Sequence, residues 1–217
     1  MMQNTGQLQQ LVSEAFRLIE EGGKLDDIEV FIQNHPRVKK AWTQKRGKYP
    51  EVRISITAAE IHELYESGVV VDGQIVASKI SAADPLTKLL YALSWKQGDI
   101  KKINHVIRGI LNSNNEDKDG NSGPVLFQFG RHLAQPHAEP IVDQHVIRAY
   151  SVWKANSAIE VEDAQRIAIL GTEHSAAVRG YRLWFQGIVS KKNQLMGAVI
   201  DDLVFAVGKS IKPNGLR

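Results

Sequence analysis

Apolar residues recur along most of the chain at intervals of three and four positions. Over residues 8–19 they form one continuous stripe, and Gly22 and Gly23 follow as a helix stop. The same spacing predicts helices over 25–33, 58–65, 85–97 and 100–111, helices beginning at about Pro124 and Asp143, and helices near 162–170, 174–189 and 194–207. In the helix over 85–97 we expect the leucines to face inward, namely Leu86, Leu89, Leu90 and Leu93. The pattern predicts a mainly α protein.

Two short stretches have the character of strands. Residues 51–56 alternate, and residues 69–76 read VVVDGQIV, with β-branched arms around the turn pair Asp72-Gly73. We therefore expect a helical bundle with a small N-terminal β element. We divide it into an N-terminal segment, 1–82, and a C-terminal helical body, 83–217.

One helix start has an unusually complete set of signals. Asp143 stands at an N-cap position, and Val142 and Ile147 flank it as the two members of a hydrophobic staple. The helix that follows is expected to bury most of its apolar side chains and to present Arg148 on another face. His145 lies within the same turn, so a carboxylate would stand beside imidazole and basic groups.

Composition narrows the function classes. The 217 residues carry a net charge of +3 with a pI near 9.0, which permits a polyanionic partner without requiring one. The absence of cysteine excludes disulfides, a thiolate nucleophile and thiolate zinc sites. No apolar run reaches the length of a membrane span and the first ten residues lack a signal-peptide core, so we expect a cytoplasmic protein.

Residues 37–53 are rich in lysine and arginine and contain two aromatic residues, Trp42 and Tyr49. Such a segment could contact nucleic acid. The alternative, which we favour, is a solvated loop whose aromatic side chains fold back onto the core. Trp184 and Phe185, later in the chain, are likewise predicted to belong to the core.

Common catalytic and cofactor motifs are missing. The chain contains no GxxxxGK[ST], GxGxxG, GxSxG or HExxH pattern, and its seven histidines have no tight ligand spacing. We therefore predict neither a cofactor nor a metal.

The stretch PIVDQHV, from Pro140 to Val146, resembles the helix-hairpin-helix DNA glycosylase superfamily, which includes the 8-oxoguanine and adenine glycosylases. Members have a glycine-containing hairpin, a helix and then a motif of the form Pro-hydrophobic-Asp-x-x-Val. The resemblance covers chiefly residues 85–155 and implies that Asp143 is the catalytic aspartate. It also implies that DNA is the partner. Backbone amides near Ser122 and Gly123 would hold a phosphate, and Gln144, His145 and Arg148 would shape the site.

The chain departs from that family at the hairpin. Bifunctional members carry a lysine about twenty positions before the aspartate, whereas Lys118 is the nearest lysine here and belongs to a polar loop. The resemblance therefore implies a monofunctional mechanism of base excision. A second reading stays open, in which the chain is a catalytically inactive DNA-binding or assembly subunit with a protein partner and Asp143 only caps its helix.

Overall fold

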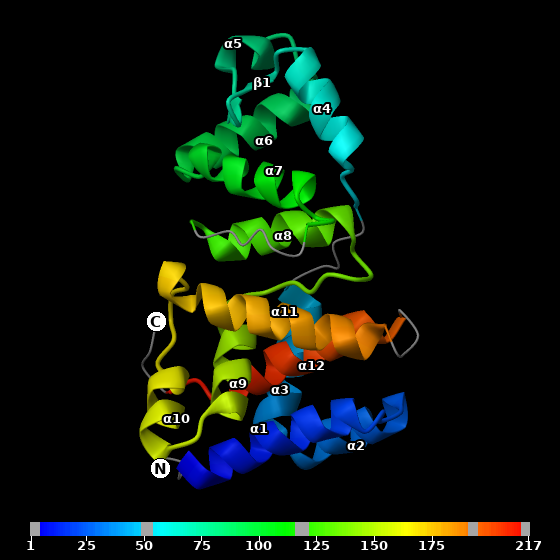
Figure 1. Ribbon diagram of the computed structural model, residues 1–217, viewed down its shortest axis with the longest axis vertical. Coiled ribbons are helices and arrows are strands. Elements are labelled where there is room, and N and C mark those ends of the chain that lie inside the picture. The colour runs from blue at the N-terminus through cyan, green and yellow to red at the C-terminus, as the bar shows by residue number, and fades with distance from the viewer. Residues whose placement is uncertain (1–4, 49–53, 116–121, 191–194, 214–217) are drawn as a thin grey trace. The chain divides into compact units, whose positions relative to one another are not determined.

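The computed structural model describes residues 5–48, 54–115, 122–190 and 195–213, and it is mainly helical with one small two-stranded sheet (Figure 1). This confirms the predicted fold class at that level. The chain forms two compact units, residues 1–53 with 137–217 (unit 1) and residues 54–136 (unit 2). The division expected at residue 82 does not coincide with them. The N-terminal helices instead pack on the C-terminal helices, because the apolar faces of the helices over residues 5–20 and 36–48 need an apolar partner.

Unit 1 is built around helix α9, which packs against four other helices of the unit. Its helices are α1 (Thr5–Glu20), α2 (Leu25–Asn34), α3 (Pro36–Lys48), α9 (Gln144–Lys154), α10 (Ala158–Gln165), α11 (Ser175–Val189) and α12 (Leu195–Ser210), with a 3₁₀ turn η2 (Thr172–His174). Phe16 of α1 stacks on Trp153 of α9, with ring centroids 4.4 Å apart. Phe185 is buried, as predicted, and Trp184 packs on the same core with part of its surface exposed.

Two local predictions for unit 1 were wrong. The basic segment expected to be a loop forms helix α3 up to Lys48, because lysine, alanine and glutamine favour helices and the apolar face of α3, with Val38 and Ala41, is buried. Tyr49 and the rest of that segment lie outside the described residues. The helix expected over 162–170 is α10, which begins earlier because the side chain of Ser157 caps it.

Unit 2 contains α4 (Ala58–Glu66), β1 (Val70–Val71), β2 (Gln74–Ile75), α5 (Ala77–Ile80), α6 (Pro85–Lys96), the 3₁₀ turn η1 (Ile100–Lys102), α7 (Ile103–Leu111) and α8 (Pro124–Ala134). The predicted hairpin is confirmed, with positive φ angles of 50° at Asp72 and 73° at Gly73. The strand expected over 51–56 falls partly outside the described residues, and residues 54–56 have no regular structure.

Helices α7 and α8 pack closely because glycines stand where they meet. A Cβ atom added to Gly109 would lie 2.0 Å from the carbonyl oxygen of Phe127. A Cβ added to Gly130 would lie 2.1 Å from the carbonyl oxygen of Val106. The two glycines therefore allow the backbones of α7 and α8 to approach each other closely.

The leucines of α6 are not inward, contrary to the expectation from their spacing. Leu86, Leu89, Leu90 and Leu93 are 63%, 66%, 54% and 53% exposed, and α6 has no buried residue. The helix itself was predicted correctly, but no other element of unit 2 covers the side of α6 that carries these leucines. Within the described residues, no helix is both long and apolar enough to cross a membrane.

Candidate functional site

Asp143 caps helix α9 as predicted. Its backbone is extended and its Oδ1 accepts hydrogen bonds from the backbone N–H groups of His145, at 2.7 Å, and Val146, at 2.9 Å. Val142 and Ile147, the two staple residues, are both buried. The side chain of Asp143 is only partly buried, and among the described residues its second oxygen, Oδ2, has no hydrogen-bond partner. The backbone thus fixes the carboxylate through one oxygen and leaves the other available.

Arg148 is fully buried, which corrects the expectation that it lies on an exposed face. Its Nε donates to the carbonyl of Gln165 at 3.0 Å, one terminal nitrogen donates to the carbonyl of Gly208 at 3.0 Å, and the other donates to the carbonyl of Ile167. These carbonyls lie at or just beyond the C-terminal ends of α10 and α12, where helix dipoles attract a cation. Burial lowers the pKa of Arg148 to about 10, so the guanidinium stays charged at neutral pH. The residue predicted to contact DNA is therefore an internal clamp between three helices.

The clamp also fixes the ring of His145. The guanidinium of Arg148 lies 2.7 Å from Nδ1 of His145, and because a guanidinium can only donate, Nδ1 must accept. The neutral ring then carries its proton on Nε2. Burial lowers the pKa of His145 to about 4, with the charges of Arg148, Lys209 and Lys212 acting in the same direction and Asp143 opposing them. At neutral pH His145 is uncharged, with its tautomer set.

Three lysines lie near the rings of Phe205 or His145: Lys45, Lys209 and Lys212, the three-lysine group. The Nζ atoms of Lys45 and Lys209 lie 5.0 and 5.5 Å from the centroid of the Phe205 ring, whose centroid is 5.0 Å from that of the His145 ring. Lys212 is close enough to His145 to act on its pKa. Lys45 also forms an ion pair with Asp202 at 2.6 Å. Lys209 and Lys212 therefore add positive charge on the side of His145, whereas Asp202 offsets the charge of Lys45.

The segment leading into Asp143 is held from two helices. Asp201 of α12 accepts a hydrogen bond from the backbone N–H of Ile141 through Oδ2, at 3.0 Å, and from the hydroxyl of Tyr181 through Oδ1, at 3.0 Å. Glu139 is buried and accepts from the side-chain amide of Gln186 at 3.0 Å. Burial raises the pKa of Asp201 to about 7. These contacts fix Glu139 and Ile141, which precede the staple residue Val142, and with them the position of Asp143.

Sequence reasoning missed this anchoring residue. Asp201 and Asp202 interrupt an apolar stretch, and Asp201 shares one face of α12 with Gly197, Val204 and Gly208, four residues that are all buried. A lone acidic residue on a predicted buried face was the available signal, because such a group is retained only when it is hydrogen-bonded.

The other predicted residues fall into two groups. Gln144 is the first residue of α9 and is partly exposed, beside Asp143. Ser122 and Gly123 belong to unit 2, where Ser122 is exposed and Gly123 has the left-handed angles φ 67° and ψ 52° at the start of α8. A Cβ on Gly123 would meet the ring of His105 at 2.8 Å. Both the left-handed backbone and the lack of space for a side chain therefore require glycine at this position.

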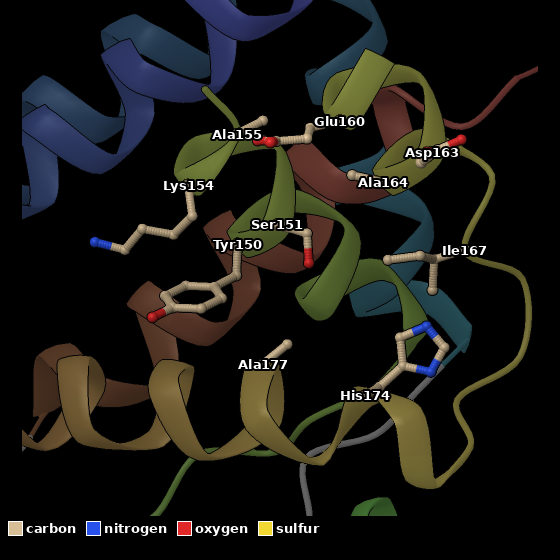
Figure 2. A pocket seen from close by; sticks show the side chains of 10 residues that line it. All are labelled: Tyr150, Ser151, Lys154, Ala155, Glu160, Asp163, Ala164, Ile167, His174 and Ala177. Carbon is tan, nitrogen blue, oxygen red and sulfur yellow. The ribbon is translucent and has the colours of Figure 1, made fainter. Parts of the chain in front are cut away.

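A separate hollow of about 510 Å³ lies between α9, α10 and the start of α11 (Figure 2). Tyr150, Ser151 and Lys154 line it from α9, and His174 lines it from η2. None of the residues predicted for the site lines this hollow. Groups of histidine, aspartate and glutamate able to hold a metal do not occur within the described residues.

Comparison with protein-family models, with curated proteins and with solved structures found no match for this chain.

Proposed function

We propose that the chain binds duplex DNA and excises a base by a monofunctional mechanism, with Asp143 as the catalytic carboxylate. The observation that carries the proposal is the state of that side chain. One oxygen is fixed by two backbone N–H groups, and the other has no hydrogen-bond partner among the described residues. Oδ2 is thus available to accept a proton or to face the sugar, which is the oxygen that the proposed role would use in addition to the cap.

The reaction requires a carboxylate held in this way. Water attacks the sugar carbon C1′ while the bond from C1′ to the base nitrogen breaks, and the base leaves with that electron pair and takes up a proton. Asp143 would accept a proton from the water, or stabilise the positive charge that develops on the sugar. The N-terminus of α9 stabilises the negative charge that either role needs. The target nucleotide must first leave the stack, which costs a few kcal/mol.

The surroundings of Asp143 support a DNA partner. Lys209 and Lys212 supply charge for phosphates, and His145 is neutral with an Nε2 proton that can be donated to a base or a phosphate. Gln144 adds a side-chain amide at the first position of the helix. In unit 2, the backbone amides near Ser122 and Gly123, at the start of α8, would hold a further phosphate. Arg148 contributes by orienting His145 and not by touching DNA.

Binding to labelled duplex DNA over a salt series tests the first step. We expect the logarithm of the affinity to fall linearly with the logarithm of the salt concentration, with a slope of about 0.9 for each neutralised phosphate. Lys212→Gln is expected to reduce that slope by about 0.9, the contribution of one phosphate contact. Lys24→Gln, at the start of α2, is the control and should leave the slope unchanged. Absence of binding at low salt would contradict the proposal.

One observation favours the second reading, an inactive subunit with a protein partner. The exposed leucines of α6 form an apolar surface of the kind that marks protein contacts. DNA binding with a normal salt slope but no excision of any base would favour that reading over catalysis.

A further inference from the structure

Helix α6 carries a continuous apolar face that the rest of unit 2 leaves uncovered. Its four leucines, Leu86, Leu89, Leu90 and Leu93 (the leucine face), are each more than half exposed and lie on one side of the helix. Trp95 is 67% exposed and lies on the opposite side of the helix. Exposed apolar residues scattered singly are ordinary, but four on one helical face require a partner surface.

The leucine face is symmetric about its own midpoint. Reversing the helix about the point between Leu89 and Leu90 exchanges those two residues and exchanges Leu86 with Leu93. An antiparallel pair of α6 helices related by a two-fold axis would therefore place leucine against leucine at every position. Self-complementarity of this kind is what an isologous interface needs.

The charges of α6 favour the same arrangement. Asp84 caps its N-terminus, Lys96 stands in its last turn, and Lys88 is its other charged residue. In an antiparallel pair, Lys96 of one copy lies level with the acidic N-terminus of the other, and the two helix dipoles oppose each other. A parallel pair would instead set the two Lys96 residues level with each other, whereas Lys88 lies on the side of Trp95, away from the leucine face, in either orientation. Charge thus selects the antiparallel orientation.

We infer that the protein forms a homodimer through the antiparallel pairing of α6 across a two-fold axis, with the leucine face of each copy covering that of the other. Twelve helical residues extend over about 18 Å, so the interface is smaller than the roughly 800 Å² per partner of a typical stable complex. The dimer is correspondingly weak, and we expect a dissociation constant of roughly 1–100 µM.

Sedimentation of the full chain at concentrations from about 1 to about 300 µM tests the proposal. The wild type should pass from monomer to dimer in that range. Leu89→Lys with Leu90→Lys should weaken association at least about 100-fold, because four like charges then meet at the axis. Trp95→Lys is the matched control, since it replaces an exposed apolar residue of the same helix on the other side, and it should leave the dissociation constant unchanged. A wild type that stays monomeric throughout, or association lost equally in the control, would overturn the inference.

Disulfide cross-linking distinguishes the orientation, because the chain has no cysteine of its own. Under an added oxidant, Leu90→Cys should cross-link to itself near the axis. Leu86→Cys alone and Leu93→Cys alone should cross-link poorly. When both variants are present together they should cross-link to each other efficiently. Cross-linking of each single variant with equal efficiency would show a parallel pair and contradict the proposed geometry. All of these measurements are independent of DNA.

Discussion

Asp201 accepts a hydrogen bond from the backbone N–H of Ile141 at 3.0 Å, and so ties helix α12 to the segment that carries Asp143. Its other oxygen accepts from Tyr181, and Asp201 is buried. A buried carboxyl with two donors is a fixed point in the structure, and its ionisation must affect stability.

The first prediction concerns stability against pH. Burial raises the pKa of Asp201 from 3.8 to about 7, so between these values the folded protein holds a proton that the unfolded chain has released. The contribution of Asp201 to the free energy of unfolding therefore falls as pH rises from about 4 to 7, by at most about 1.4 kcal/mol per pH unit, and is constant above that range. Asp201→Asn should abolish this dependence, because its amide oxygen can accept from Ile141 and its amide nitrogen can donate to Tyr181.

Urea unfolding at several pH values checks this prediction. Asp26→Asn is the control, since it removes an exposed carboxylate in the first turn of α2 that does not contact Ile141. If Asp201→Asn and the wild type have parallel pH profiles, Asp201 does not titrate in this range.

His145 should give a slope of the opposite sign. Its pKa is lowered from 6.5 to about 4, so between these values the unfolded chain holds a proton that the folded protein lacks. Its contribution to the free energy of unfolding is present above pH 6.5 and is lost as pH falls towards 4. His145→Asn keeps an acceptor for Arg148 and should remove this loss, which unfolding curves at pH 4.5 and 7 would show relative to His62→Asn on the exposed side of α4. The same acid sensitivity in His145→Asn would contradict the assignment.

Arg148→Met should destabilise the protein by at least about 3 kcal/mol, because three carbonyls in or near the core lose their donor. Arg148→Lys should recover only part of the lost stability, since one ammonium group cannot reach all three carbonyl oxygens. Denaturant unfolding provides the measurement, with Arg166→Met, at an exposed ion pair, expected to change stability by less than about 0.5 kcal/mol. Equal effects at positions 148 and 166 would refute the clamp.

Two helix glycines should respond to alanine in opposite directions. A Cβ on Gly208 would lie 1.8 Å from the carbonyl oxygen of His145, so Gly208→Ala must separate α12 from α9 and should cost several kcal/mol, on the order of 3. A Cβ on Gly187 meets nothing within 4 Å, so Gly187→Ala should stabilise the protein by about 0.5–1 kcal/mol. Thermal and denaturant unfolding of the two variants test the packing directly, and a stable Gly208→Ala protein would show that α9 and α12 are further apart.

Local signals in the sequence predicted local structure well. The cap at Asp143, the staple around it and the turn at Asp72-Gly73 each depend on a few adjacent residues, and all three are present. Which faces are covered depends on residues far apart in the chain. The spacing of Leu86 to Leu93 predicts a helix with an apolar side, but it cannot say whether another element packs there. Arg148 was misplaced for the same reason, because its three carbonyl partners come from distant helices.

Single-turnover excision by Asp143→Asn tests the central claim most directly. Duplexes that each carry one uracil, hypoxanthine or 8-oxoguanine would be incubated with excess protein, and release of the base would be timed. Asparagine caps a helix as well as aspartate does, so the variant should keep the wild-type fold and affinity for DNA while losing the charge. Asp84→Asn makes the same exchange at the cap of α6 and is the control. We predict that Asp143→Asn excises at least about 100-fold more slowly than the wild type and that Asp84→Asn is unaffected. Excision by Asp143→Asn at the wild-type rate, or no excision by the wild type from any duplex, would contradict the assignment of Asp143 as the catalytic carboxylate.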